Sequence, residues 1–231
     1  MVKEELIQRS PLRIFEQSIH GGLQAGEIGV IASQAGVGKT SVLVQLAMDK
    51  LLQGKKVIHV SFTKHTNHVL AWYEDIFDEF ISKKNLENAD DVKNEIVKNR
   101  VLMNFNQDVM SKDQIIRSLR AMIIDGGFSA ESIIIDGFDF NHLSAGTGAD
   151  HNSVAGVKAF AKELGLSVWY SCNVNGNGLQ DNFFDLADVI IVLDARHDHI
   201  ELSVTKDRDS RDIKAMAMQL DPKTLLISGG E

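Results

Sequence analysis

A loop of small residues that ends in a lysine and a threonine is the strongest chemical signal in the sequence. It runs from Ser33 to Thr40 as SQAGVGKT, between an apolar run and a segment with helical spacing. Gly36 and Gly38 lack a Cβ atom, so the main chain there can adopt unusual dihedral angles and turn several N–H groups toward one anion. The amino end of the next helix adds partial positive charge at the same place. The pattern therefore predicts a phosphate site.

Each residue of this loop has an expected part in the phosphate site. Lys39 is expected to reach the β and γ phosphates of a nucleotide, and the Thr40 hydroxyl to ligate Mg²⁺. Ser33 stands where the G-x-x-x-x-G-K-[ST] pattern has glycine, which an extended backbone tolerates. The alternative is a flexible loop with an exposed lysine. The residues expected to contact the nucleotide are Ser33, Gln34, Ala35, Gly36, Val37, Gly38, Lys39, Thr40 and Ser41.

A carboxylate at the end of a second apolar run would complete a Mg²⁺ site together with this loop. Ile133, Ile134 and Ile135 precede Asp136. In a parallel sheet the carboxyl end of such a strand lies at the ligand edge, where Asp136 could hold a water of the Mg²⁺ shell. A strand followed by an aspartate turn is common, so the prediction of a metal site rests on the pair of motifs.

Strands and helices alternate along the chain and must position both motifs. The helices are expected at Lys39 to Leu52, His68 to Lys83, Lys112 to Ile124 and Ser153 to Leu164. Six runs are apolar without alternation, as in strands buried on both faces: Ile28 to Ala32, Val57 to Phe62, Val101 to Phe105, Ser132 to Ile135, Leu166 to Tyr170 and Val189 to Leu193. Alternation predicts parallel strands in a sheet covered by helices on both faces, with ligands at the carboxyl ends.

Two segments depart from this alternation. From Val189 onward strands follow one another at short spacing, which predicts antiparallel hairpins added to one edge of the sheet. The stretch Lys83 to Lys98 is highly charged and is expected to be a solvated helix or an insertion.

The length and composition predict one domain. The 231 residues are about 1.5 times the ~150 residues of a typical domain. The chain is 44% hydrophobic and 24% charged, with two prolines, which allows a core and excludes disorder or collagen. We expect a lead-in over residues 1–19, a core over 20–193 and a C-terminal hairpin region over 194–231. The one cysteine, Cys172, and the lack of an apolar segment of about 18 residues predict a cytoplasmic protein without a membrane span.

A further segment carries a resemblance to a known family. The run from His20 to Glu27, HGGLQAGE, leads directly into the first strand and the loop. It resembles the GGL-x-x-GE segment of RecA-superfamily ATPase domains, in particular the KaiC and DnaB-helicase branch. The resemblance extends from about Ser10 to about Ser228. It implies ATP and Mg²⁺ as cofactors, a nucleotide at a subunit boundary, and either a homo-oligomer, such as a hexameric ring, or assembly with a related subunit.

The resemblance also implies a glutamate just beyond the second strand, which activates the attacking water. Aligning HVSFTKH with that strand end puts Thr63 at this position, and threonine cannot act as a carboxylate base. Loss of a positioned base costs about 10²- to 10⁴-fold in rate, so we expect slow turnover. Asp139, Glu74 and Asp75 are candidate replacements, and an alignment error of one or two residues around Thr63 is the alternative.

A lysine and an arginine near the C-terminus match a second family feature. Lys206 and Arg208 follow IELSVT and resemble the K-x-R pair that subunits of this branch insert into a neighbour's nucleotide site. There a guanidinium would stabilise the charge that develops on the γ phosphate. The alternative is a charged hairpin turn. The polar sensor of the superfamily falls near Cys172 or Asn173, without the usual glutamine.

Nucleic acid is a disfavoured partner. The chain has 24 Lys+Arg against 32 Asp+Glu, a net charge of −8, and the candidate DNA loops, residues 137–152 and 173–184, contain no Lys or Arg. Phe138, Phe140, Phe183 and Phe184 could stack on bases, although such residues more often belong to the core. The H-x-x-H of His65 and His68 and the cluster around His197 lack a full ligand set.

These observations lead to one expected function with alternatives. We expect an α/β, RecA-like domain that binds ATP and Mg²⁺, hydrolyses ATP slowly and acts as an oligomeric, nucleotide-dependent regulatory or signalling module with a protein partner. The alternatives are a non-hydrolysing ATP-binding interaction module and a DNA-processing ATPase related to DnaB and RecA motors. A KaiC-like kinase is also open, although nothing marks a phosphoacceptor.

Overall fold

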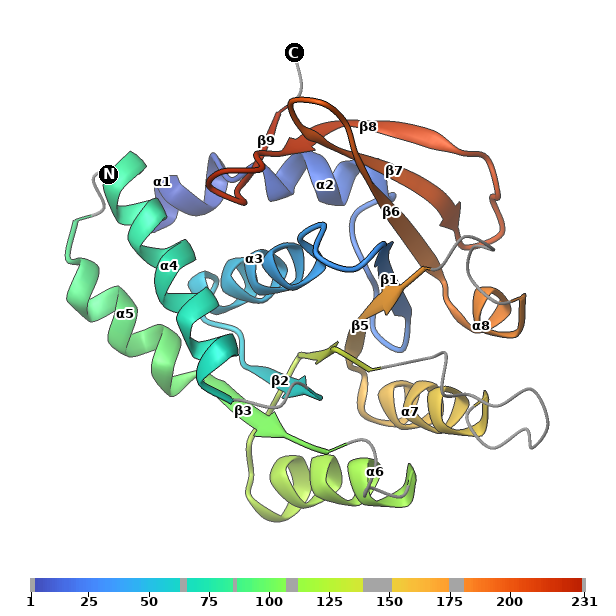
Figure 1. Ribbon diagram of the computed structural model, residues 1–231. Coiled ribbons are helices and arrows are strands. Elements are labelled where there is room, and N and C mark those ends of the chain that lie inside the picture. Colours follow the sequence, from blue (N-terminus) through green and yellow to red (C-terminus); the bar gives the residue numbers. More distant parts are fainter. Residues whose placement is uncertain are drawn as a thin grey trace.

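The computed structural model describes residues 3–62, 66–84, 87–106, 112–138, 151–174 and 181–229. Within these ranges nine strands form one sheet in the order β3-β2-β4-β5-β1-β6-β7-β8-β9 (Figure 1). The strands from β3 to β6 in this order are parallel, and β6 to β9 pair antiparallel. The expected α/β architecture, with a mostly parallel sheet and antiparallel strands at the C-terminal end, is confirmed.

The strand bounds lie close to those predicted. The parallel strands are β1 (Ile28–Ser33), β2 (Val57–Ser61), β3 (Arg100–Asn104), β4 (Ser132–Asp136), β5 (Ser167–Asn173) and β6 (Val189–Ala195). The antiparallel strands are β7 (Ile200–Asp207), β8 (Lys214–Leu220) and β9 (Ile227–Gly229). All residues of β1, β2 and β4 are buried, as expected for strands covered on both faces. The prediction of full burial is wrong for β3, whose residues are half-buried or exposed because β3 lies at the edge of the sheet.

Helices cover both faces of the sheet (Figure 1). One core cluster joins the sheet to α1 (Lys3–Gln8), α2 (Leu12–Ser18), α3 (Lys39–Leu52), α4 (Thr66–Lys84) and α5 (Ala89–Lys98). A second cluster, on the other face, joins it to α6 (Lys112–Arg120), which continues as a π-helical turn over Ala121–Asp125, and to α7 (His151–Leu164) and α8 (Asp181–Leu186). None of the helices in the described ranges has both the length and the hydropathy of a membrane-crossing segment.

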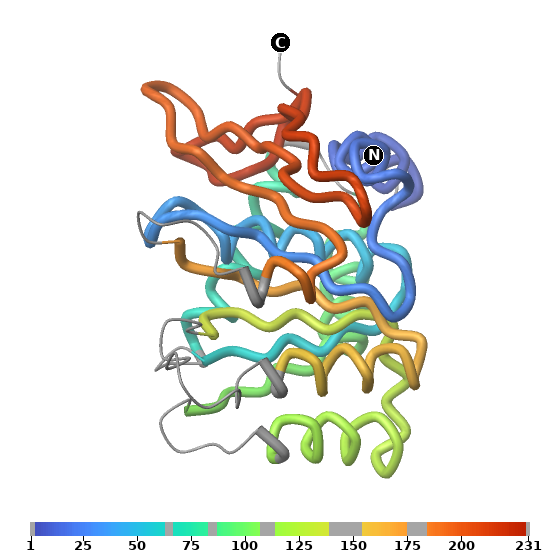
Figure 2. Tube along the Cα trace, turned by 90° about the vertical axis from the view of Figure 1, so that its right-hand side faces the viewer, coloured from blue at the N-terminus to red at the C-terminus, as the bar shows by residue number. Residues whose placement is uncertain are grey.

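The charged stretch and two aromatic residues of α4 both belong to the first of these faces. Most of the charged stretch forms α5, a solvated helix that buries Val92 and Ile96 against the core. Tyr73 and Phe77 of α4 are buried in the same cluster. Figure 2 shows α1 and α2 beside the last strands of the sheet, in agreement with the contacts between α2 and β8.

The order of the strands places a topological switch point at the carboxyl end of β1. From this end the chain passes into α3, on one face of the sheet. The neighbouring strand β5 leads toward α8, which packs on the opposite face. In open α/β sheets ligands bind at such switch points, outside the carboxyl ends of the strands. The loop from Ser33 to Thr40 lies at this point.

Candidate functional site

The loop between β1 and α3 has the backbone conformation that a phosphate site requires. Gly36 has φ 83° and Gly38 φ 112°, in a region that residues with a Cβ atom rarely adopt. A Cβ atom on Gly38 would also lie 2.7 Å from Cδ2 of Leu220. Helix α3 begins directly after Gly38, so the unpaired N–H groups of its first turn belong to the loop.

Lys39 is folded back into the loop. It is 9% exposed, and its Nζ donates hydrogen bonds to the carbonyl of Gln34 (2.8 Å), the carbonyl of Ser33 (3.2 Å) and Oγ of Ser33 (3.2 Å). Burial lowers the pKa of Lys39, while the charge of Asp136 and the neighbouring Cys172 oppose that shift. An anion in the loop would offer this ammonium stronger acceptors than the carbonyls that it now uses.

Ser33 takes a part that the sequence pattern did not reveal. Its hydroxyl donates to the carbonyl of Gln34 (2.9 Å) and accepts from Lys39. A glycine, which the motif has at this position, could not make either bond. The departure from the motif therefore adds one acceptor for the buried ammonium.

The two predicted metal-binding groups are in direct contact. Thr40 Oγ1 donates to Oδ2 of Asp136 over 2.9 Å. Asp136 ends β4 and is 2% exposed, and α3 packs across β4, which explains how residues from separate elements meet. The sequence placed both at one edge of the sheet, and the structure brings them together.

Polar strand ends surround this pair. Ser61 of β2 is the register partner of Asp136, and Asn173 of β5 is the register partner of Ser33. Ser171 Oγ accepts a hydrogen bond from the main-chain N–H of Gly137 (2.8 Å). Cys172 is buried and is paired in register with Ala32. The residues proposed as a sensor, Cys172 and Asn173, thus lie beside the loop.

The β8–β9 turn, residues 221–226, also reaches the loop, which no sequence signal indicated. Ser41 Oγ donates to the carbonyl of Leu225 (2.5 Å), and so does Gln45 Nε2 (2.9 Å). The main-chain N–H of Ile227 donates to Gln45 Oε1 (2.8 Å). The beginning of α3 is therefore attached to the end of the sheet.

Arg208 lies at the opposite, amino edge of the sheet, after β7. Its guanidinium pairs bidentately with Glu27, from Nε to Oε1 (2.9 Å) and from Nη2 to Oε2 (2.8 Å). It also donates to Oδ1 of Asp207 (2.5 Å) and to the carbonyls of Ile19 (3.1 Å) and Gly22 (2.9 Å). All five of its N–H donors thus have partners within the same chain. They attach the GGL-x-x-GE segment to β7.

Lys206 is held within its own chain as well. It is 7% exposed, and its Nζ donates to the carbonyl of Phe184 over 2.7 Å. Burial lowers the pKa of Lys206, and nearby Arg211 adds to that shift. Insertion of Lys206 and Arg208 into a neighbour's site stays a prediction, and it would require both residues to exchange these partners.

The remaining sequence candidates are only partly described. Thr63, Asp139, Phe140 and His65, and most of the candidate DNA loops, lie outside the described residues, as do the side chains of Phe183 and of the other helix-end residues next to those loops. Glu74 and Asp75 are exposed on α4. Phe138 packs edge-on against Phe62, with ring centroids 5.2 Å apart. In the part of the chain that the structure describes, no three His, Cys, Asp or Glu side chains gather where they could hold a metal ion by themselves.

A buried histidine lies near this site and was missed in the sequence. His59 of β2 is fully buried, and its Nδ1 lies 3.1 Å from the hydroxyl of Tyr73. The Arg100 guanidinium lies 4.1 Å from the centre of the Tyr73 ring. Burial lowers the pKa of His59 to about 4; the charge of Asp136 opposes this shift and that of Arg100 adds to it. His59 is therefore neutral at pH 7.

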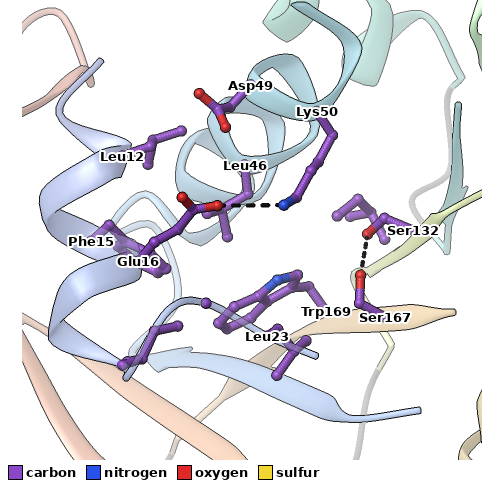
Figure 3. A pocket seen from close by; sticks show the side chains of 13 residues that line it. Leu12, Phe15, Glu16, Leu23, Leu46, Asp49, Lys50, Ser132, Ser167 and Trp169 are labelled. Carbon is purple, nitrogen blue, oxygen red and sulfur yellow. Dashed lines mark hydrogen bonds and ion pairs between the residues drawn. The ribbon is translucent and has the colours of Figure 1, made fainter. Parts of the chain in front are cut away.

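A cavity lies at the other edge of the sheet, away from the loop (Figure 3). It has about 420 Å³ of empty volume, part of it open to solvent, between α2, α3 and the amino ends of β4 and β5. Trp169 lies along one side, and Lys50 reaches across toward Glu16, with 3.4 Å between Nζ and Oε1. The cavity shares no residue with the loop, so the candidate site does not depend on it.

We predict that burial of His59 makes the free energy of unfolding fall in acid. The unfolded side chain, with a pKa near 6.5, binds more protons between pH 6.5 and about 4 than the folded one does. Its contribution to the free energy of unfolding is thus present above pH 6.5 and is lost as the pH falls toward 4, by about 2 kcal/mol between pH 7 and pH 5. Urea denaturation at both pH values should show this loss in the wild type but not in His59→Gln. The exposed His197→Gln is the control, and an equal loss in all three proteins would contradict the prediction.

A second prediction concerns the anchoring role of Arg208. Arg208→Ala removes the guanidinium from Glu27 and Asp207, which keep only their contacts with Gln24 and His20 among those described, and it should lower the free energy of unfolding by about 3 kcal/mol. Arg211→Ala is the matched control, because that side chain is 66% exposed and, in the described structure, contacts the exposed Asp185 and the ring of Phe184; it should change stability by less than about 1 kcal/mol. Equal stability of the two variants in chemical denaturation would refute the anchoring role.

Comparison with known proteins adds no assignment to this geometry. No protein-family model matches the sequence, and no curated protein does. The function therefore has to be argued from the loop, the Thr40–Asp136 contact and their surroundings.

Proposed function

We propose that the chain is a RecA-like ATPase domain of the KaiC type that binds ATP and Mg²⁺ at the loop from Ser33 to Thr40. The observation that carries the proposal is the 2.9 Å contact between Thr40 and Asp136. It joins the loop to the end of β4 in the arrangement that a nucleotide-bound Mg²⁺ needs. The strand order and the position of the loop at the switch point support the same reading.

The residues at the loop fit both cofactors. The positive φ angles of Gly36 and Gly38 and the free N–H groups at the start of α3 suit a polyphosphate, and the ammonium of Lys39 lies among them. Mg²⁺ commonly takes one or two protein oxygens and completes its shell with phosphate oxygens and water. Thr40 and Asp136 would supply those protein oxygens. The bound ion would neutralise charge on the phosphates.

Slow hydrolysis is the second part of the proposal. It rests on Thr63, the residue expected where a catalytic glutamate belongs. Glu74 and Asp75 are exposed on α4 and have no described contact with the loop. A domain that holds ATP for long periods suits a regulatory or signalling role, because the bound state lasts long enough for a protein partner to recognise it.

Assembly through the nucleotide sites is the third part. Lys206 and Arg208 would act on the site of a second copy, or of a related subunit, in a homo-oligomer such as a ring. In the described arrangement, however, Lys206 and Arg208 are bound to groups of their own chain and do not extend toward a neighbour. This observation favours a second candidate function, a non-hydrolysing ATP-binding interaction module. Light scattering with and without ATP and Mg²⁺ distinguishes an assembling protein from a monomeric one.

Binding of ATP provides the first test. Lys39→Ala should weaken ATP binding by about 10- to 100-fold, because a charge-assisted contact to phosphate is lost. Asp136→Asn keeps an acceptor for Thr40 but removes the charge, so the gain in ATP affinity on adding Mg²⁺ should disappear. Titration calorimetry measures both effects. Lys50→Ala, on the same helix but paired with Glu16, is the control and should bind like the wild type. Equal affinities for the wild type and Lys39→Ala would refute the proposed site.

Turnover provides a separate test. Thr63→Glu restores a carboxylate at the expected position and should raise the rate of ATP hydrolysis by about 100-fold. A phosphate-release assay measures the rate, and the double variant Lys39→Ala/Thr63→Glu should be inactive, which excludes a contaminating ATPase. Fast hydrolysis by the wild type that Thr63→Glu does not increase would overturn the missing-base hypothesis while leaving ATP binding intact.

A further inference from the structure

The phosphate loop and the β8–β9 turn are connected through one buried side chain. Gln45 lies on α3, one turn after Ser41, and is 3% exposed. Its Nε2 donates to the carbonyl of Leu225 (2.9 Å), and its Oε1 accepts from the main-chain N–H of Ile227 (2.8 Å). One amide thus binds an acceptor in the turn and a donor at the start of β9, much as a neighbouring strand would.

The same amide holds the first turn of α3. Gln45 Nε2 also lies 3.2 Å from the carbonyl of Ser41 and 3.1 Å from its Oγ. Ser41 itself donates to the carbonyl of Leu225 (2.5 Å). The helix end that would face a phosphate is therefore bound to the turn twice, once directly and once through Gln45.

The turn is built to present this carbonyl. Asp221 Oδ1 accepts from the main-chain N–H groups of Lys223 (2.7 Å) and Thr224 (2.9 Å), which closes the turn. Leu225 has φ 54°, a left-handed conformation that a residue with a Cβ atom rarely adopts. A strained backbone persists only where its surroundings determine it. Here the N–H of Leu225 donates to the carbonyl of Asp221 (2.7 Å), and its carbonyl is bound by Ser41 and Gln45.

The backbone of the loop also rests on this part of the sheet. A Cβ atom on Gly38 would lie 2.7 Å from Leu220 Cδ2 and 3.8 Å from Leu225 Cδ2. Leu220, at the end of β8, and Leu225, in the β8–β9 turn, therefore pack next to Gly38 of the loop. A shift of the turn would move the N–H groups of the loop relative to a bound phosphate.

We propose that Gln45 is a positioning residue of the phosphate site and that the β8–β9 turn responds to occupation of that site. Phosphate binding holds the loop and the first turn of α3, and Gln45 transmits this restraint to Leu225 and Ile227. The conformation of the C-terminal antiparallel strands thereby depends on whether a nucleotide is bound. This inference rests on the proposed ATP binding.

The test compares Gln45, within α3, with Gln53, the residue directly after the last residue of that helix. Gln45→Met keeps the length of the side chain but removes its hydrogen bonds. Gln53→Met is the matched control, because Gln53 is at the far end of α3 and donates to Asp49 (2.6 Å). Two quantities are measured: the affinity for ATP with Mg²⁺, and the hydrogen exchange of residues 34–41 and 221–229 with and without saturating ATP and Mg²⁺.

We expect ATP to slow exchange in both segments of the wild type and of Gln53→Met. Gln45→Met should bind ATP about tenfold more weakly. At saturation its residues 34–41 should still be protected, while residues 221–229 exchange at the same rate with and without ATP. Loss of the link between the two segments is a result that a merely structural role for Gln45 would not produce.

Three results decide the matter. Wild-type affinity and wild-type protection of residues 221–229 in Gln45→Met would overturn the inference, even if the variant were less stable. If Gln45→Met does not fold, Gln45→Asn, which keeps the amide on a shorter chain, takes its place under the same criteria. If the wild type does not bind ATP, the proposed function and this inference are both refuted. If the wild type binds ATP but residues 221–229 exchange at the same rate with and without it, the inference alone is refuted.

Discussion

The path of α3 across the sheet is the constraint on which the candidate site depends. Strand β1 pairs with β5 and β6, whereas the next strand along the chain, β2, pairs with β3 and β4. The helix that joins them must therefore cross β5 and β4, and it contacts both. This crossing places Thr40, at the start of α3, over the end of β4. The contact between Thr40 and Asp136 is thus a consequence of strand order, although the two residues are 96 positions apart.

The basic side chains at the two edges of the sheet have different kinds of partners. At the carboxyl edge Lys39 is bound by oxygens of its own loop, which an incoming anion can replace. At the amino edge Arg208 is bound by two carboxylates and two carbonyls, which connect the segment before β1 to the end of β7. The first arrangement suits a ligand and the second suits cohesion of the fold. A resemblance in sequence cannot distinguish them, because both are a basic residue beside a turn.

Much of the fold was predictable because it follows from local patterns. Helix α3 has the predicted bounds, and the six parallel strands lie within two or three residues of their apolar runs. The loop and Asp136 were predictable for the same reason, since glycines, a lysine and a strand-ending carboxylate carry their chemistry in residue type and order. The position of β3 at the edge of the sheet was not predictable, because it depends on strand order rather than on composition.

Most of the missed features of the site are contacts between different elements of the fold, whereas the hydrogen bonds of Ser33 lie within the loop itself. Gln45 and Leu225 are 180 positions apart, and His59 meets Tyr73 from a neighbouring element. In sequence Gln45 is an ordinary polar residue within a helix, and His59 interrupts an apolar strand without any motif. Only the packing of α3 and α4 on the sheet gives these side chains buried polar partners.

Leu225 shows how strongly the phosphate loop and the end of the chain are matched in shape. A glycine would adopt its left-handed backbone with about 1–2 kcal/mol less conformational strain. Glycine would also lack the side chain whose Cδ2 lies 3.8 Å from the position of a Cβ atom on Gly38. Gly38 has no room for a side chain because Leu220 occupies that space, and Leu225 lies next to the same position at van der Waals distance. The glycine of the loop and these two leucines near the end of the chain therefore constrain one another's size.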